Sequence, residues 1–547
     1  MVGRVAAAAV GIVALWAVIS LALNLPRWPT ELFGPLHLAL AVEVGIAFAL
    51  VALLPGRRPL RITLAILLTA LVALRLMDLT AQSVVARPLN LFLDVTLVPA
   101  LYTVLRTTVG AAESVALLLG AALGLVACFW LIALALRVVE RLARRRDGRI
   151  ALGIVLPAGL LLFLLGATFQ TPWRPVVASA GGAVAFQVDQ MARTLDRHAA
   201  FRAAADQDAF AGLDGETLAA GLREADVFVI FVESYGVTAL DDSQFAPVMA
   251  ARLAAFEDKL AAAGLSGVSG RLDSPTVGGQ SWLAHSTLLS GLRIADQTLY
   301  SLLLTGDRRT LTDLMGRAGY RTVGLMPAIT LPWPEGEMMG FDAIHDAHDM
   351  NYEGPLWYWG TIPDQYALAF LERQELSETG RPPIFTVAAL IGSHAPWTPV
   401  PEVIEDWSLI GDGRIFHRFV DNGEPPEIVW RDPGSIRAYY ARSVGASIDI
   451  LASWAARHLD QGDLAIILGD HQPAPVVTGP GAPPDVPIHI VSGDPSLLAP
   501  FRGWGFVPGM VPGPGVAARP MEDFRDFFLR AFTVPRPEMA GGERTGS

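Results

Sequence analysis

The chain is too long and too apolar to be a single soluble domain. Its 547 residues are 52% hydrophobic and only 17% charged, and the mean hydropathy is +0.42, which indicates membrane segments joined to a soluble part. The formal net charge of -12 disfavours nucleic acid as a general partner. The one cysteine, Cys128, excludes disulfides within the chain and cysteine-rich metal sites.

Five apolar runs occupy the N-terminal third of the chain. They lie near residues 5–25, 36–54, 61–78, 111–136 and 150–168. Most approach the length of about 20 residues that a helix needs to cross a bilayer, so we expect a bundle of about five transmembrane helices within residues 1–170. The first run has no convincing cleavage site and is followed by further spans, which favours a membrane helix over a signal peptide.

Arginines between these runs predict which side of the membrane each loop faces. They are Arg4, Arg57, Arg58 and Arg61, and a group of five from Arg141 to Arg149. The positive-inside rule puts three segments in the cytoplasm: the start of the chain before the first run, the loop between the second and third runs, and the loop between the fourth and fifth runs. Five spans then carry the chain beyond residue 170 to the outside. We expect residues 88–106 to form an interfacial helix on that outer side, because Asp94 and Arg106 oppose a full span.

Residues 171–222 are predicted to connect the membrane bundle to a soluble domain. Pro172 and Pro175 open this segment, and an amphipathic stretch from about Phe186 to Ala205 predicts a helix. We expect this helix to lie along the membrane surface or along the soluble domain.

From Asp226 onward, short apolar runs alternate with helical patterns. The runs lie at 227–232, 322–325, 385–390, 464–468 and 487–491, and the helical patterns at about 245–263, 309–318, 363–374 and 434–458. Runs that carry β-branched residues and lack a polar face are typical of buried parallel strands. We therefore expect an α/β/α sandwich with a mostly parallel sheet at residues 223–533, followed by a disordered tail at 534–547.

Carboxylates and imidazoles gather at the ends of these runs. Glu233 follows the first run, Ser393 and His394 follow the third, Asp470 and His471 follow the fourth, and His489 lies inside the fifth. Because ligands bind beyond the carboxyl ends of parallel strands, these residues are candidates for one site. Glu233, Asp470 and His471 offer O, O and N ligands that suit zinc or manganese, with magnesium as a further candidate.

The stretch Gly278-Gly279-Gln280-Ser281 precedes a predicted short helix that ends at Gly291. The glycines allow a tight turn or a close approach to a ligand, and a serine at a helix N-terminus lies where free N–H groups favour an anion. Ser281 is therefore a candidate nucleophile toward phosphate and, as alkoxide, a fourth metal ligand. An N-cap serine is the commoner explanation of such a residue taken alone, but the polar strand ends favour the catalytic one.

These residues resemble the alkaline phosphatase superfamily, and more narrowly its membrane-anchored branch of lipoteichoic acid synthases and phosphoethanolamine transferases. The matching positions are Glu233, Ser281, Ser290-Gly291, Gly319-Tyr320-Arg321-Thr322, Trp359-Gly360 with Asp364, Ser393-His394 with Pro396, and Asp470-His471. The resemblance covers about residues 226–491. It implies a divalent metal held by Glu233, Asp470 and His471, Ser281 as nucleophile, and His394 as the histidine that contacts the transferred phosphate.

The likeness does not single out one sub-family. Trp333 lies in the stretch comparable to the head-group pocket of lipoteichoic acid synthases, without the histidine and arginine that accompany the tryptophan there, and the disulfides usual in phosphoethanolamine transferases are missing. His285 lies four residues after Ser281 on the same helix face and is an equal candidate for the site or the core. Trp333, His285 and Trp397 are the candidate substrate contacts, and His489 is a further candidate for proton transfer.

Together these features predict a multi-pass enzyme of the cytoplasmic membrane with its catalytic domain on the extracytoplasmic, periplasmic side. Ser281 would take a phospholipid head group, phosphoglycerol or phosphoethanolamine, and pass it to a lipid or glycan acceptor of the envelope. Two alternatives stay open: a phosphoester hydrolase with water as acceptor, and a catalytically silent scaffold in envelope assembly. The sequence leaves the donor, the acceptor, the metal and the oligomeric state open.

Overall fold

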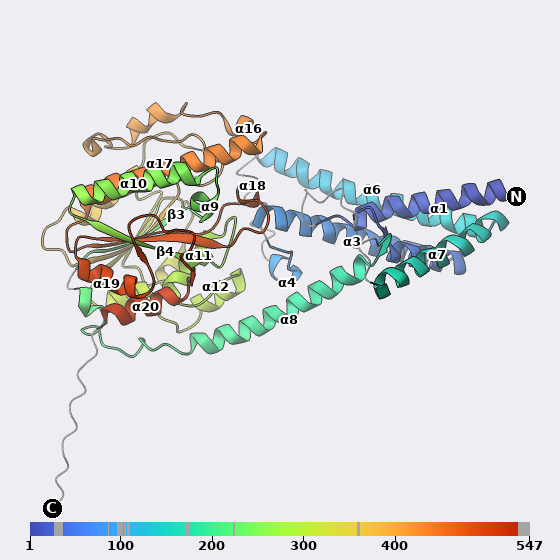
Figure 1. Cartoon of the computed structure of the whole chain (residues 1–547), viewed down its shortest axis with the longest axis horizontal. Coiled ribbons are helices and arrows are strands. Elements are labelled where there is room, and N and C mark those ends of the chain that lie inside the picture. Colours follow the sequence, from blue (N-terminus) through green and yellow to red (C-terminus); the bar gives the residue numbers. More distant parts are fainter. Residues whose placement is uncertain are drawn as a thin grey trace, which may run out of the picture. The chain divides into compact units, whose positions relative to one another are not determined.

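The computed structural model describes residues 1–26, 37–85, 87–95, 102, 106, 110–169, 174–222, 225–357 and 362–533. The chain divides into two compact units, Met1–Asp196 and Arg197–Ser547, each of which is described by itself (Figure 1). The division falls inside the segment 171–222 that the sequence assigns to a connector. The expected tail at 534–547 lies outside the described residues.

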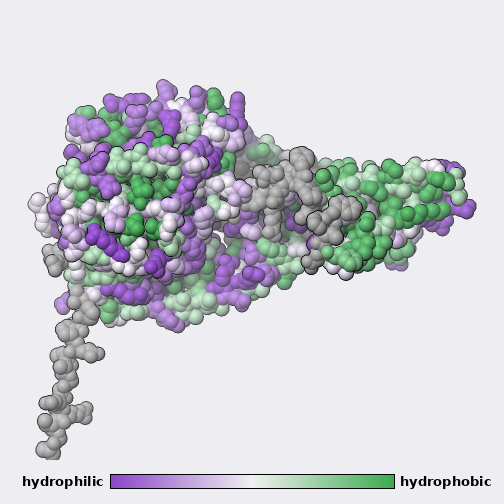
Figure 2. Space-filling view, in the orientation of Figure 1, coloured by the Kyte–Doolittle hydropathy of each residue, from purple (hydrophilic) through white to green (hydrophobic). Residues whose placement is uncertain are grey.

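Among the described residues, four helices are long and apolar enough to cross a membrane. They are α1 (Val2–Leu23), α3 (Arg58–Val85), α6 (Ala111–Ala143) and α7 (Arg146–Phe169). Their outward-facing side chains are largely apolar, which Figure 2 shows as a green surface. Such a surface suits lipid rather than water as its surroundings, so the N-terminal unit has the properties of a membrane anchor.

The second predicted span is a shorter helix than expected. Only α2 (Val42–Leu53), with 12 residues, lies within residues 36–54, and at about 1.5 Å per residue it covers roughly half of a bilayer core of about 30 Å. Before it, β1 (Leu40–Ala41) pairs in parallel with β2 (Val176–Val177). The structure thus has four apolar helices of spanning length and a fifth, shorter one that buries Val44, Phe48 and Val51 in the bundle.

Two further predicted helices of the N-terminal part have different outcomes. The amphipathic stretch forms α8 (Ala180–Ala205), which begins earlier than predicted. Of the interfacial helix expected at 88–106, the structure shows one turn, α4 (Leu91–Asp94). Most of the remaining residues of that stretch lie outside the described part of the chain.

The second unit contains a mixed sheet of nine strands within the described residues, in the order β10-β4-β9-β8-β3-β7-β5-β6, with β11 beside β4. The strands are β3 (Val227–Val232), β4 (Ser266–Asp273), β5 (Arg321–Met326), β6 (Ala343–Asp346), β7 (Ile384–Leu390), β8 (Leu464–Gly469), β9 (Asp485–Ser492), β10 (Val507–Pro508) and β11 (Arg519–Pro520). The run from β8 to β6 is parallel. The fifth apolar run forms β9, which pairs antiparallel with both β8 and β4.

Helices cover both faces of this sheet (Figure 1). One layer is built around α10 (Ala246–Ala262), α15 (Asp364–Leu371) and α17 (Pro433–His458), and the other around α11 (Ser281–Ser290), α13 (Leu311–Arg317), α19 (Pro495–Gly503) and α20 (Asp523–Phe532). Shorter helices are α9 (Thr238–Asp241), α12 (Gln297–Leu304), α14 (Pro334–Met338), α16 (Pro426–Val429) and α18 (Pro475–Thr478). The predicted α/β/α sandwich is confirmed.

The central strand shows why its sequence lacks a polar face. In β3, Phe228 and Ile230 belong to the core on the side of α10 and α17, whereas Val229 and Phe231 belong to the core on the other side. Alternate side chains of a strand point to opposite faces, and here both faces are covered. All six residues of β3 are therefore buried, as in other parallel sheets between two helical layers.

Candidate metal centre

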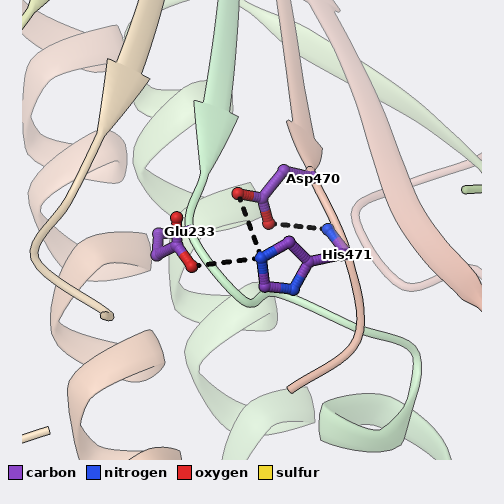
Figure 3. A group of neighbouring side chains, drawn as sticks. All are labelled: Glu233, Asp470 and His471. Carbon is purple, nitrogen blue, oxygen red and sulfur yellow. Dashed lines mark hydrogen bonds and ion pairs between the residues drawn. The ribbon is translucent and has the colours of Figure 1, made fainter. Parts of the chain in front are cut away.

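Two neighbouring parallel strands bring the predicted metal ligands together. Val232 and Gly469, the last residues of β3 and β8, are paired with each other. Glu233 follows β3 and Asp470 follows β8, so the two side chains lie next to each other at the same edge of the sheet. With His471 they form a group whose ligand atoms lie within 4.8 Å of one another (Figure 3). All three side chains are buried. Among the described residues this is the only such group of three histidine, cysteine or acidic side chains.

Backbone contacts set the orientation of His471. Its Nδ1 donates to the carbonyl oxygen of Gln472 at 2.8 Å, which fixes the proton on Nδ1 and leaves Nε2 with a lone pair for a metal. Nε2 lies 3.2 Å from Glu233 Oε1 and 3.8 Å from Asp470 Oδ2. The other oxygen of Asp470, Oδ1, accepts the backbone N–H groups of Ser234 at 2.8 Å and His471 at 2.6 Å.

Ser281 completes the cluster that the sequence predicts. It is the first residue of α11, and its Oγ lies 2.9 Å from Glu233 Oε2 and 3.2 Å from His471 Nε2. The preceding residue, Gln280, has a φ of 65°, so the chain turns sharply into the helix. The hydroxyl therefore lies both at a helix N-terminus and within reach of two candidate metal ligands.

The loop that precedes Ser281 is joined to the loop that carries His471. The backbone N–H of Gly278 donates to the carbonyl oxygen of Gln472 at 2.8 Å, the same oxygen that accepts from His471. Ser274 Oγ donates to the carbonyl oxygen of Asp470 at 2.6 Å. Gly278 and Gly279 have φ values of 75° and 145°, conformations that L side chains rarely adopt. The two glycines thus allow the turn that sets Ser281 beside the ligands.

The charges in this buried cluster are unbalanced. Burial and the Glu233 charge raise the pKa of Asp470 to about 8. Burial lowers the pKa of His471, but Asp470 and Glu233 outweigh it and raise that pKa to about 9. For Glu233, burial raises the pKa, while the neighbouring histidines outweigh burial and lower it. The cluster therefore places two carboxyl groups and one imidazole in a buried space. A divalent cation would offset the negative charge of the two carboxylates there.

His394 lies next to this cluster, after the neighbouring strand β7. Its Nδ1 donates to the carbonyl oxygen of Ala395 at 2.5 Å. Burial lowers the pKa of His394, and the Glu233 charge partly opposes that shift, so the two side chains lie within electrostatic range of each other. This position suits the predicted contact with a phosphate.

His285 packs against the strand that carries Glu233. Its ring centroid lies 4.2 Å from that of Phe231, and burial lowers its pKa to about 4. Its Nε2 is buried without a hydrogen-bond partner among the described residues. Of the two options that the sequence left open for His285, these contacts favour packing on the sheet.

His489 and Trp397 are buried and make hydrogen bonds within the core. Both ring nitrogens of His489 are used, with Nδ1 2.8 Å from Ser269 Oγ and Nε2 3.1 Å from the Tyr235 hydroxyl. Trp397 donates its indole N–H to the carbonyl oxygen of Ser393 at 2.8 Å and is 3% exposed. These contacts favour a structural role for both residues, and their predicted roles at the site stay predictions.

Trp333 stays in the candidate set. It is half-buried before α14, and its ring centroid lies 6.4 Å from that of Phe341. Among the described residues, His345 of β6 and His348 just after it do not form a second metal group. His345 Nε2 lies 2.7 Å from Glu375 Oε1, and His348 Nε2 lies 3.0 Å from the Thr330 carbonyl oxygen.

Three residues hold the centre through contacts that the sequence did not predict. Gln472 holds both loops through its carbonyl oxygen, Ser393 Oγ donates to the backbone carbonyl oxygen of Glu233 at 2.6 Å, and Asp364 accepts from the loop before His394. The motif that contains Asp364 was visible in the sequence, although its Trp359-Gly360 lies outside the described residues. The contacts of Gln472 with His471 and Gly278 run through its backbone carbonyl oxygen, so they leave no signal in residue type.

No family model matches the chain, and no curated protein matches its sequence. Solved structures do match. The lipoteichoic acid synthase LtaP from Listeria monocytogenes is 12% identical, with a TM-score of 0.36 over 52% of this chain and 67% of that chain. The phosphoglycerol transferase GacH from Streptococcus pyogenes is 12% identical, with a TM-score of 0.34 over 54% of this chain and 74% of that chain.

A protein of the alkaline phosphatase superfamily from Vibrio parahaemolyticus is 16% identical, with a TM-score of 0.33 over 50% of this chain and 60% of that chain. Other matches include sulfatases and phosphonate monoester hydrolases. The matches include the superfamily and the lipoteichoic acid synthases that the sequence motifs resemble. At TM-scores of 0.33 to 0.36 these three matches assign no role to any residue, so the role of each residue rests on this chain's own geometry.

Proposed function

We propose that this chain is a metal-dependent phosphotransferase that moves a phospholipid head group to an envelope lipid or glycan through a phosphorylated Ser281. The observation that carries this proposal is the position of Ser281 Oγ, 2.9 Å from Glu233 and 3.2 Å from His471 Nε2 at the N-terminus of α11. A hydroxyl held there can lose its proton and gain a phosphoryl group without moving the backbone.

Glu233, Asp470 and His471, with Ser281, would hold the divalent cation, for which manganese and zinc are the first candidates and magnesium a further one. When bound, such an ion lowers the pKa of a hydroxyl and polarises a phosphate. The donor set supports this assignment, because its three buried residues offer two carboxyl groups and one imidazole. The contact of His471 Nδ1 with Gln472 leaves Nε2 as the ring nitrogen that faces Glu233 and Asp470.

The reaction has two halves that regenerate the enzyme. In the first, Ser281 Oγ attacks the phosphorus of the donor, its P–O bond to diacylglycerol breaks, and the leaving oxygen takes up a proton. In the second, an acceptor hydroxyl attacks the same phosphorus, the bond to Ser281 breaks, and the proton of the acceptor is released. His394 is the residue that would neutralise phosphate charge or carry the proton in each half.

Two observations support a lipid donor and an extracytoplasmic site. The chain carries its own apolar helices, so its substrate and its anchor would share one membrane. The arginine-rich loops favour an outside catalytic domain. The acidic net charge of -12 speaks against a nucleic-acid partner.

The first experiment looks for the covalent intermediate. Intact-protein mass spectrometry of the full chain, after incubation with vesicles of phosphatidylglycerol or phosphatidylethanolamine, should show an adduct whose mass identifies the head group. Ser281→Ala should lose the adduct and slow turnover by ~10³-fold or more. Ser286→Ala and Ser290→Ala, later on the same helix, are the controls and should remain active.

Three outcomes separate the alternatives. Normal turnover by Ser281→Ala, or an adduct on Thr276 or Ser286, would reject the proposed nucleophile. An adduct that only water discharges, with no product on a lipid or glycan acceptor, would make the chain a hydrolase. A protein that binds neither metal nor phosphate would fit the silent scaffold.

A second experiment tests sidedness. Protease added to intact spheroplasts should cleave the C-terminal unit, while a reporter fused after Arg146 should stay protected. Protection of the C-terminal unit would overturn the outward orientation.

A further inference from the structure

Asp364 is a buried carboxylate that the proposed reaction does not use. It is the first residue of α15 and is 1% exposed. Within the described residues, no arginine, lysine or histidine forms an ion pair with it. Burying a carboxylate without a cation is costly unless hydrogen bonds replace the lost water, so its contacts indicate what the residue is for.

Two of the three hydrogen bonds of the Asp364 side chain hold the end of one strand, and the third comes from Ser447 of α17. Its Oδ1 accepts the backbone N–H groups of Ile391 at 3.0 Å and Gly392 at 2.7 Å, and its Oδ2 accepts from Ser447 Oγ at 2.6 Å. Ile391 and Gly392 are the first residues after β7. The carboxylate thus holds two successive N–H groups of the turn that leads to His394.

The same turn is tied to the metal ligands. Ser393 Oγ donates to the backbone carbonyl oxygen of Glu233 at 2.6 Å, and the backbone N–H of His394 donates to the carbonyl oxygen of Ile391 at 3.0 Å. A side chain at Gly392 would place its Cβ 2.5 Å from Asp364 Oδ2, so only glycine allows the carboxylate this close. The turn is therefore built around Asp364 on one side and Glu233 on the other.

From these contacts we infer that Asp364 is a positioning residue, which fixes the turn Ile391–His394 and thereby sets the His394 ring beside the metal centre. This inference rests on the proposed role of His394. Asp364 would act through hydrogen-bond geometry, because the N–H groups that it accepts belong to the turn and not to a substrate. Residues that orient a site in this way commonly change activity by about 10–100-fold when they are removed.

The test compares two neighbouring buried residues of α15 in the full chain. Gln365 is 0% exposed and makes two hydrogen bonds, at 2.8 and 2.9 Å, but to Ile404 and not to the turn. Asp364→Ala and Gln365→Ala should both lower the melting temperature. Only Asp364→Ala should slow adduct formation on Ser281 from phosphatidylglycerol and phosphatidylethanolamine vesicles, by about 10–100-fold.

Asp364→Asn is the conservative variant. Its amide oxygen can still accept from Ile391 and Gly392, and its NH₂ group can donate to Ser447 Oγ. The rate of Asp364→Asn should stay within about threefold of wild type, and Mn²⁺ affinity measured by calorimetry should change by less than about threefold in Asp364→Asn and Asp364→Ala. If Asp364→Ala fails to fold, Ser447→Ala, which removes one of the three donors, should give a smaller loss in the same direction.

A double-mutant cycle with His394 decides whether Asp364 acts through that residue. If it does, His394→Ala combined with Asp364→Ala should be no slower than His394→Ala alone. If the rate losses of the two single variants multiply in the double variant, the inference is overturned. A normal rate in Asp364→Ala, or an equal rate loss in Gln365→Ala, would overturn it as well. A normal rate in His394→Ala would instead reject the proposed role of His394, and absence of any adduct in wild type would reject the proposed function.

Discussion

Two histidines from adjacent strands show how the position of a residue along its strand decides what surrounds it. His471 follows β8, and His489 lies in the middle of β9, where it is paired with Ile467 of β8. Both are buried almost completely. His471 has one ring nitrogen on a backbone carbonyl and the other in the metal centre, whereas His489 has both nitrogens on hydroxyl groups.

The difference follows from the topology. A residue just after a parallel strand emerges at the edge where ligands gather, whereas a residue inside a central strand meets only its neighbours in the sheet. The surroundings then act in opposite directions: carboxylates raise the pKa of His471 to about 9 in spite of burial, while burial lowers the pKa of His489 to about 3. Two histidines that look alike in sequence should therefore respond differently to the same substitution.

The largest expected effect is at His471. His471→Ala should remove bound metal and slow turnover by ~10³-fold or more, because it deletes a ligand from the centre. Glu233→Ala and Asp470→Ala should do the same without unfolding the domain. Metal analysis of the purified protein measures bound metal, and circular dichroism measures folding. His417→Ala, at an exposed histidine, is the control and should keep its metal. Stoichiometric metal in Asp470→Ala would contradict the assignment of the ligands.

The same topology explains what the sequence could predict. Buried parallel strands have long apolar runs, so β3, β7 and β8 were recognised and the polar residues after them were assigned to one site. The strand β4 (Ser266–Asp273) was missed because it contains two glycines, Gly267 and Gly270, whose missing side chains make room for Met510 and Phe506. Without β4, the run at 487–491 seemed to be another parallel strand, and His489 was taken for a candidate.

Two further differences between the expectations and the structure have similar physical causes. Trp397 follows a strand end, but the indole N–H is turned back onto Ser393, a local contact that residue order does not encode. The short α2 has the composition of a span over residues 36–54, and its length is limited by β1, which pairs with residues 176–177, far away in the sequence. Patterns of hydrophobicity predict elements well, but contacts between distant segments decide where they end.

A smaller effect is expected at His489, on stability and not on chemistry. His489→Ala leaves a cavity and two hydroxyl groups, of Tyr235 and Ser269, without their partner, which should destabilise the unit by about 2–4 kcal/mol. Metal content and the rate per folded molecule should stay near wild type. Thermal unfolding and metal analysis measure these properties, and loss of metal from His489→Ala at full folding would return this residue to the site.

The smallest expected effect is the pH dependence that His489 adds to stability. Its folded pKa is about 3, against about 6.5 in an unfolded chain, so the folded protein keeps His489 neutral while the unfolded chain takes up a proton. The unfolded state therefore binds more protons below about pH 6.5, and the free energy of unfolding falls as pH drops from there toward 3, by up to about 1.4 kcal/mol per pH unit for one group.

Other buried histidines add to this slope, so the informative quantity is a difference. His489→Gln cannot titrate but can still hydrogen-bond with Tyr235 or Ser269, and its melting temperature should fall less between pH 7 and pH 5 than that of wild type. Equal losses in both proteins would mean that His489 is already protonated in the folded state, and the contrast with His471 would then fail.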